Sequence, residues 1–180
     1  MTHPINRRSF LKLGLLAPVL PLPAFAGQLS AGERRLSLHN LHTGEKVDLP
    51  YWIDGDYVAA SLADINRVLR DHRTDQVAAI DPSLLDLLNR VSATVGASKP
   101  FEIISGYRSP ASNLMLNAST SGVAKRSLHM EGKAIDVRLP GIPLADLRQA
   151  GLLLKGGGVG YYPESNFVHL DVGRVRTWGA

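Results

Sequence analysis

The feature that most constrains the fold is a pair of short apolar segments, each with one polar residue at its centre. Residues 133–139 place Asp136 between an isoleucine and a valine. Residues 167–172 place His169 between a valine and a leucine. Runs of this length and composition indicate strands, in which successive side chains point to opposite faces. Each polar side chain therefore faces away from its apolar neighbours, and the two face one another if the strands are adjacent.

A second histidine precedes the first of these strands. His129 lies seven positions before Asp136, and Gly132 between them permits a turn that brings His129 back over the strand entry. Two imidazoles and one carboxylate suit a zinc ion with one coordination position open for water, as in a hydrolytic site. The sequence therefore predicts a metal-dependent hydrolase. The other histidines are interpreted as surface or hydrogen-bonded residues, although His39 or His42 could line a cleft: His3, His39, His42 and His72.

The first residues are typical of an export signal. Residues 6–12 (Asn-Arg-Arg-Ser-Phe-Leu-Lys) form a twin-arginine motif, an apolar run follows, and small residues stand at Ala24 and Ala26. We expect residues 1–26 to be a twin-arginine signal peptide, cleaved after Ala26, that engages the twin-arginine export machinery and directs residues 27–180 to the periplasm. The apolar run is short and interrupted by prolines, so no stable membrane insertion is expected after cleavage.

Composition narrows the function further. The chain has no cysteine, which excludes disulfides, thiolate metal sites and a lipoprotein anchor. It has 20 Lys+Arg and 16 Asp+Glu, and removal of residues 1–26 takes away three basic residues and no acidic ones. The remaining 17 basic and 16 acidic residues give a net charge of +1, and no run of Lys/Arg alternates with aromatic residues, so nucleic acid is not expected as a partner. The length of 27–180 suits one domain, and we expect a monomer.

Periodicity and turn residues predict an α+β fold: a single domain with a mostly antiparallel central sheet and helices packed on one side. Residues 34–52 alternate around a glycine turn and predict a β-hairpin. Residues 119–127 are small, polar and basic, and suggest a mobile loop. Helices are predicted at 57–72, 81–96, 111–118 and 143–154, and further strands at 101–105, 133–139, 159–162 and 167–172.

Three segments together resemble a known group of enzymes. The pattern SxHxxGxAxD at residues 127–136, followed by FxHxD at 167–171, resembles the signature of zinc peptidases of the D-Ala-D-Ala carboxypeptidase and hedgehog-like group. Residues 105–109 (Ser-Gly-Tyr-Arg-Ser) match a third segment of that group. The closest resemblance is to single-domain, exported murein endopeptidases of the YcbK-like or MepK-like branch. It covers nearly all of residues 27–180.

The resemblance implies roles for individual residues. His129, Asp136 and His169 would bind Zn²⁺, with water as the fourth ligand. Arg108 would stabilise the developing oxyanion or hold a substrate carboxylate. Ser127 would bond to the His129 loop or to substrate, with capping of a helix or turn as its alternative. Tyr107 would line the cleft and contact substrate, with packing as its alternative.

The sequence departs from the wider group at one position. Many members carry a glutamate, the general base, three residues before the last histidine, where this chain has Asn166. Asp171 is the first replacement candidate, because residues i and i+2 of a strand share a face. Its alternative role is to accept the free N–H of a metal-binding histidine. Glu164 and Glu131 are the other candidates.

The implied function is that of a zinc-dependent murein endopeptidase, which hydrolyses the peptide crosslinks between peptidoglycan stem peptides in the periplasm. Whether 4-3 or 3-3 crosslinks are cut stays open at this point. Two alternatives also stay open: a non-catalytic module that binds zinc and peptidoglycan, and a carboxypeptidase that releases D-Ala.

Overall fold

The N-terminal β-hairpin organises one half of the sheet. In the computed structural model, which describes Met1, residues 32–119 and residues 124–179, β1 (Glu33–Asn40) and β2 (Lys46–Ile53) pair antiparallel. The predicted turn is present: the Asn40 side chain accepts hydrogen bonds from the backbone N–H groups of His42 and Thr43, and Gly44 has φ 74°. The two-residue strand β3 (Asp56–Tyr57) extends the hairpin.

Two sequence predictions lie wholly or partly outside the described residues. The signal peptide at 1–26, with its cleavage after Ala26, is one, since only Met1 of it is described. The loop at 119–127 is the other, because residues 120–123 are not described. Within the described ranges, no helix combines the length and the apolar character needed to cross a membrane.

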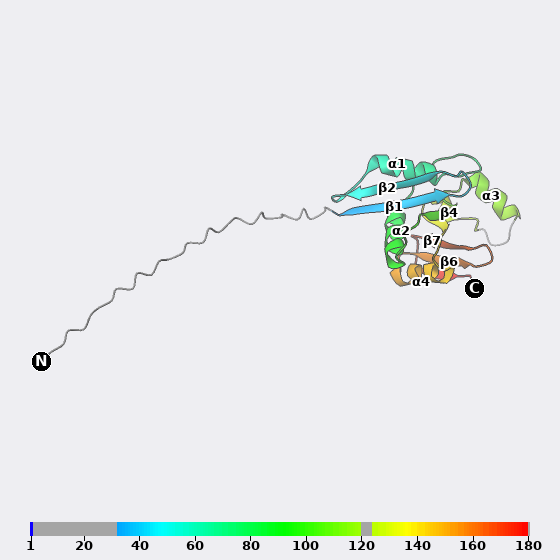
Figure 1. Cartoon of the computed structure of the whole chain (residues 1–180). Coiled ribbons are helices and arrows are strands. Elements are labelled where there is room, and N and C mark those ends of the chain that lie inside the picture. The colour runs from blue at the N-terminus through cyan, green and yellow to red at the C-terminus, as the bar shows by residue number, and fades with distance from the viewer. Residues whose placement is uncertain (2–31, 120–123, 180) are drawn as a thin grey trace.

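The strands form one open sheet. In the described part of the chain it has eight strands in the order β3-β2-β1-β4-β5-β7-β6-β8 (Figure 1). Five of the seven neighbouring pairs are antiparallel, and β1·β4 and β6·β8 are parallel. The remaining strands are β4 (Phe101–Ser105), β5 (Ala134–Arg138), β6 (Gly158–Tyr162), β7 (Phe167–Asp171) and β8 (Arg176–Trp178). The last of these was not predicted, since three residues show no periodicity.

Helices connect the strands. They are α1 (Ala59–Val68), α2 (Pro82–Thr94), α3 (Pro110–Ser119), the 3₁₀ helix η1 (Leu128–Glu131) and α4 (Leu144–Leu154). Asp81 caps α2 by accepting the N–H of Ser83, and Pro82 occupies its first turn. The helix predicted at 57–72 is shorter than expected at both ends, because Tyr57 pairs in β3 and the helix ends at its C-cap, Leu69.

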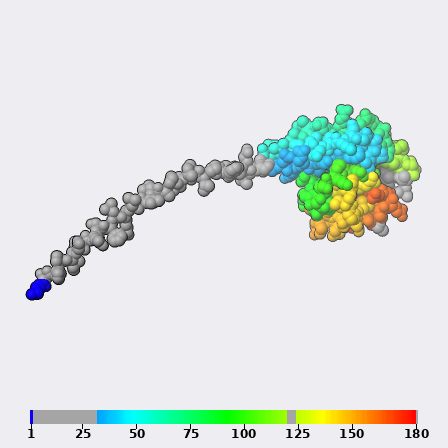
Figure 2. All heavy atoms as spheres, viewed as in Figure 1, coloured from blue at the N-terminus to red at the C-terminus, as the bar shows by residue number. Residues whose placement is uncertain are grey.

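The core lies on one face of the sheet. Side chains of α1, α2 and α4 pack there against the apolar residues of the strands, including Leu38, Ile135 and Leu170. Figure 2 shows the segments up to α1 (blue to cyan) on one side of the folded body and the C-terminal segments (yellow to orange) on the other. The predicted α+β single domain with a mostly antiparallel sheet is confirmed. The polar residues of β5 and β7 consequently occupy the face opposite the core.

One carboxylate ties the hairpin to α2. Asp86 accepts hydrogen bonds from the Tyr51 hydroxyl at 2.8 Å, the Tyr57 hydroxyl at 2.8 Å and the Arg34 guanidinium at 2.7 Å. Burial alone would raise the pKa of Asp86, but these donors outweigh it and lower the pKa. The Tyr51 side chain is fully buried, so its hydroxyl depends on Asp86 for a partner.

We expect Asp86→Ala to lower the free energy of unfolding by about 1–3 kcal/mol, because it leaves the buried Tyr51 hydroxyl unpaired. Urea denaturation followed by circular dichroism measures the loss. Asp48→Ala is the matched control, since Asp48 forms only an exposed ion pair with Arg35, and it should cost less than about 1 kcal/mol. Equal losses in both variants would contradict the role of Asp86.

Candidate active site

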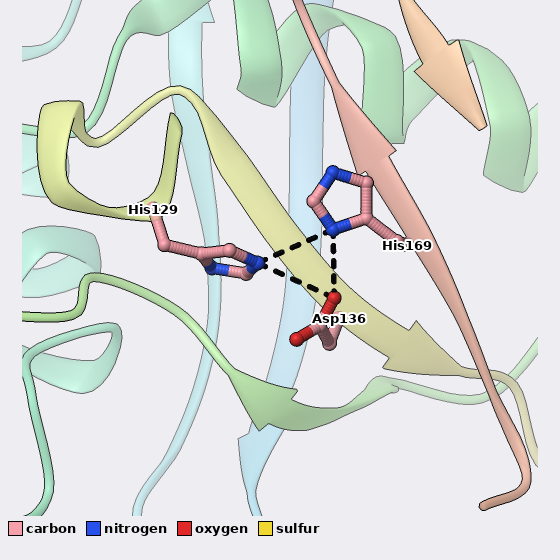
Figure 3. A group of neighbouring side chains, drawn as sticks. All are labelled: His129, Asp136 and His169. Atoms are coloured by element: carbon pink, nitrogen blue, oxygen red, sulfur yellow. Dashed lines mark hydrogen bonds and ion pairs between the residues drawn. The ribbon is translucent and has the colours of Figure 1, made fainter. Parts of the chain in front are cut away.

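Two strands and a helical turn bring three ligand-type side chains together. Asp136 of β5 and His169 of β7 are direct partners in the strand register. The alternation predicted that these side chains face one another if the two strands are adjacent, and the strands are adjacent. The His169 Nδ1 lies 2.9 Å from the Asp136 Oδ1. His129 of η1 completes the group: its Nε2 is 3.3 Å from the Asp136 Oδ1 and 3.2 Å from the His169 Nδ1 (Figure 3).

The turn that returns His129 to the sheet depends on its two ends. Ser127 caps η1, because its Oγ accepts the backbone N–H of His129 at 3.3 Å. Gly132 ends η1 with φ 66°, and a Cβ there would lie 2.2 Å from the Ala79 carbonyl oxygen. Only glycine satisfies both requirements. Ser127 therefore has the capping role that was its alternative, while it also lines the cleft described below.

The outer ring nitrogen of each histidine has its own acceptor. The Nδ1 of His129 is 2.8 Å from the Gly106 carbonyl oxygen. The Nε2 of His169 is 3.0 Å from the Asp171 Oδ2. With these outer nitrogens protonated, each inner nitrogen could offer its lone pair to a metal ion beside Asp136. Metal-binding imidazoles are held in this way in proteins.

The three inner atoms suit a small tetrahedral metal ion. Nitrogen and oxygen ligands of such an ion lie about 2.0–2.1 Å from it, and therefore roughly 3.3 Å from one another. The observed separations of 2.9, 3.2 and 3.3 Å match that spacing. All three ligand atoms come from side chains that are nearly buried, with exposures of 3% for His129, 9% for Asp136 and 11% for His169. Such a group is rarely assembled at this depth without a ligand to stabilise it.

Charges within the group stabilise the ionised carboxylate. Burial alone would raise the pKa of Asp136, but the neighbouring His129 and His169 outweigh burial and hold the pKa well below its usual range. Burial would likewise lower the pKa of His169, but hydrogen bonds to Asp136 and Asp171 raise it to about 8. Asp136 is therefore ready to act as an anionic ligand, and a cation at this position is favourable.

Asp171 lies on the far side of the His169 imidazole from this group. Its side chain is fully buried and accepts hydrogen bonds from the backbone N–H groups of Gly158 at 3.0 Å and Gly173 at 2.9 Å. Arg176 contacts both of its oxygens, at 3.0 and 2.7 Å. Although burial opposes the charge, these partners and His169 lower the pKa of Asp171. The position favours support of the imidazole over proton transfer to substrate.

Arg108 reaches the site from the loop after β4. Its side chain is buried, and its nearest acceptors are distant: Ser105 Oγ at 3.3 Å, Asn113 Oδ1 at 3.5 Å and Asp136 Oδ2 at 3.6 Å. Its Nε has no partner among the described residues. Burial lowers the pKa of Arg108, with Asp136 opposing that effect. A buried guanidinium with such weak contacts is prepared to receive an anion.

Sequence reasoning missed the residue that holds this loop. Asp71, 1% exposed, accepts the backbone N–H of Ser109 at 2.7 Å. The N–H of Tyr107 is bound by the Leu69 carbonyl at 2.7 Å. Tyr107 itself packs against the core and is not among the residues that line the cleft. Asp71 follows α1 without any local pattern that marks it.

The three ligand-type residues form the floor of a cleft of about 690 Å³. Its described lining contains four arginines and one acidic residue: Arg73, Arg108, Arg126, Arg176 and Asp136. Three aromatic side chains share the lining: Tyr162, Phe167 and Trp178. His42 also lies there, stacked on His72 with ring centroids 3.7 Å apart, which fits its alternative interpretation. The cleft is thus cationic, with an aromatic wall.

The remaining candidates for a general base lie elsewhere. Glu131 is exposed and forms an ion pair with Lys133 at 2.9 Å, and Glu164 is exposed in the β6–β7 turn. Neither lines the cleft. Asn166, where many relatives of the wider group have glutamate, adopts φ 54° in that turn. This left-handed conformation suits asparagine better than glutamate, which gives a backbone reason for the departure.

A buried His-Asp-His group on the floor of an open cationic cleft is the arrangement of a metal-dependent hydrolase. Comparison with known proteins gives the particular family. Residues 28–178 match the family model described as peptidoglycan L,D-endopeptidase MepK. The chain belongs to this family.

Two curated relatives cover almost the whole chain. The peptidoglycan L,D-endopeptidase MepK of Escherichia coli (strain K12) is 46% identical over 176 residues, which are 96% of this chain and 97% of that protein. The probable peptidoglycan L,D-endopeptidase MepK of Haemophilus influenzae is 38% identical over 177 residues, 96% and 95% of the two chains. The similarity therefore includes residues 127–136 and 167–171, which carry the three metal-ligand candidates, and the segment between them.

Alanine at His129, Asp136 or His169 should reduce bound metal to less than a tenth of the wild-type content, because two remaining ligands hold the ion poorly. Atomic emission of protein purified with one equivalent of Zn²⁺ measures the content. His39→Ala, outside the cleft, is the control and should bind as wild type. Full occupancy in His169→Ala would refute the ligand assignment.

Proposed function

We propose that this protein is a zinc-dependent peptidoglycan L,D-endopeptidase that hydrolyses peptide crosslinks between stem peptides. The convergence of the His129 Nε2, Asp136 Oδ1 and His169 Nδ1 within 3.3 Å carries the proposal. Membership of the MepK family supports it, and the L,D specificity is that of the named relatives. The 3-3 crosslinks, which join stem peptides through an L,D bond, are the substrate class proposed here.

Zinc is the metal that we propose for the site. Two imidazoles and one carboxylate with tetrahedral spacing favour Zn²⁺ over Mg²⁺ or Ca²⁺, which prefer more oxygen ligands. When bound, zinc would polarise the scissile carbonyl and lower the pKa of a water molecule. His129, Asp136 and His169 would hold it, and Gly106 and Asp171 would keep the two imidazoles in the required tautomers.

The chain's own residues would bind and orient the substrate. Arg108 would hold the negative charge that develops on the carbonyl oxygen, since its guanidinium lies 3.6 Å from Asp136 with capacity to spare. Arg73 and Arg126, exposed at the cleft, would attract the carboxylates of stem peptides. The Tyr162 hydroxyl accepts the Trp178 indole N–H at 2.8 Å, so its own hydrogen can be donated toward the substrate.

We propose the periplasm as the place of action. The twin-arginine motif and the small residues before Ala26 support export, and the substrate of the named relatives is part of the cell wall. Residues 27–180 would then be the mature zinc peptidase domain. We propose that it acts as a monomer.

Incubation of the purified protein and Zn²⁺ with defined muropeptide dimers tests the activity. We expect cleavage of L,D-crosslinked dimers, with much slower cleavage of D,D-crosslinked dimers, and loss of both when a chelator removes the metal. Chromatography with mass spectrometry identifies the products.

Other outcomes of this assay would favour the alternatives. Release of free D-Ala from uncrosslinked stems, with dimers intact, would indicate a carboxypeptidase. Binding of dimers without any chelator-sensitive product would indicate a non-catalytic module. The second alternative has one observation in its favour: Asp136 is the sole carboxylate in the described lining of the cleft.

For Asp171→Asn, metal affinity and rate should fall together, by about tenfold or more, because the amide no longer accepts the imidazole N–H as strongly. Calorimetric titration with Zn²⁺ and the dimer assay measure the two quantities. Glu164→Gln, which lies in the turn outside the cleft, should change neither. A large loss of rate at full zinc affinity would instead make Asp171 the general base.

A further inference from the structure

Strand β8, which the sequence did not predict, contributes a residue to the same row across the sheet as Asp136 and His169. His169 is opposite Asp136 in β5·β7 and opposite Gly160 in β6·β7. Trp178 is opposite the same Gly160 in β6·β8. One row of residues therefore crosses four neighbouring strands and runs from the aspartate of the site to the tryptophan of β8. Arg176, two positions earlier, pairs in the same way with Gly158.

Two glycines of β6 leave space for these β8 side chains. A Cβ on Gly160 would lie 2.7 Å from the indole ring of Trp178. A Cβ on Gly158 would lie 2.4 Å from the Arg176 Nη1 and 2.5 Å from the Asp171 Oδ2. Any other residue at these positions would force the β8 side chains away. The side chains of β8 thus pass across β6 and reach β7.

Arg176 fixes the carboxylate behind the third ligand. Its guanidinium binds Asp171 through both terminal nitrogens, at 3.0 and 2.7 Å. Asp171 in turn accepts the Nε2–H of His169 at 3.0 Å. Because Asp171 is fully buried, its charge requires this bidentate partner.

Trp178 limits the movement of the same imidazole from another side. Its ring centroid lies 5.0 Å from that of His169, with the planes tilted by 55°. The indole is itself held in place, since its N–H donates to the Tyr162 hydroxyl at 2.8 Å and the Arg176 guanidinium lies 4.7 Å from its ring. Two side chains of β8 therefore support one imidazole, by an ion pair and by packing.

We infer that Arg176 and Trp178 are positioning residues that hold His169 in the rotamer and tautomer that present Nδ1 to the metal. The inference rests on the proposed zinc-dependent function. β8 would then belong to the support of the metal site, although neither residue supplies a ligand atom.

Metal affinity, measured apart from catalysis, tests the inference. Competition with a chromogenic chelator gives the Zn²⁺ dissociation constant, and urea unfolding of the metal-free protein gives its stability. Arg176→Gln should weaken zinc binding about tenfold to 100-fold, as loss of such supporting contacts does. Arg176→Lys should recover part of this, because it keeps the charge but not the planar fork. Arg174→Gln, two positions away and exposed, should bind as wild type.

Trp178 gives a second set of variants. Trp178→Ala should weaken zinc binding by about tenfold or more. Trp178→Phe should weaken it by less, because a smaller aromatic ring, without the N–H, still packs there. In Trp52→Phe protein, Trp178 is the remaining tryptophan, and Zn²⁺ should change its fluorescence with the same dissociation constant. If Arg176→Gln or Trp178→Ala does not fold, Arg176→Lys and Trp178→Phe carry the test.

Zinc affinities equal to wild type in Arg176→Gln and Trp178→Ala would overturn the inference. So would an unchanged Trp178 fluorescence at zinc concentrations that saturate the protein. Failure of the wild-type protein to bind Zn²⁺, or full binding by His129→Ala, would instead refute the proposed function itself.

Discussion

The structure depends on the burial of two carboxylates on either side of one imidazole. Asp136 and Asp171 both contact His169, at 2.9 and 3.0 Å, and both are nearly or fully buried. Buried charges are tolerated only with partners, so each carboxylate requires further contacts. Asp136 contacts His129 and Arg108, whereas Asp171 accepts hydrogen bonds from Arg176 and from two backbone N–H groups. The residues that pair with these two carboxylates make up most of the floor of the cleft.

Those partners come from distant parts of the chain and tie the cleft together. Arg108 follows β4, and its loop is held by Asp71, which follows α1. His129 is held by η1 and by the Gly106 carbonyl of the same loop. The apolar residues of the strands face the opposite way and form the core with α1, α2 and α4. One face of the sheet is therefore apolar and stabilises the fold, and the other is polar and would carry the catalytic site.

Local patterns in the sequence were sufficient for much of this. Alternation predicted the face on which Asp136 and His169 lie, whereas the adjacency and register of β5 and β7 come from the structure. The hairpin at 34–52 and the cap at Asp81 were predicted from turn and capping residues. Interactions between distant segments were not accessible. Tyr107 was expected at substrate but packs on the core, and Asp71 binds the backbone N–H of Ser109, which is distant in sequence. Arg176 and Trp178 contact the nearby residues Asp171 and His169, but only because β8 pairs with β6. The contacts of these side chains depend on how strands pair and how segments pack, which the sequence of one segment does not show.

The pairing of Asp136 with His169 also affects which register the strands of the sheet adopt. β6 has glycine at two of its five positions, and glycine-rich strands specify their pairing weakly. A slip of one residue between β5 and β7 would place Val168 or Leu170 beside Asp136 and turn His169 into the core. The unpaired buried charge would then cost several kcal/mol. Asp136 and His169 would thus also disfavour the slipped pairing of β5 and β7. A variant that lacks them would lose this preference for the correct register as well as its metal ligands.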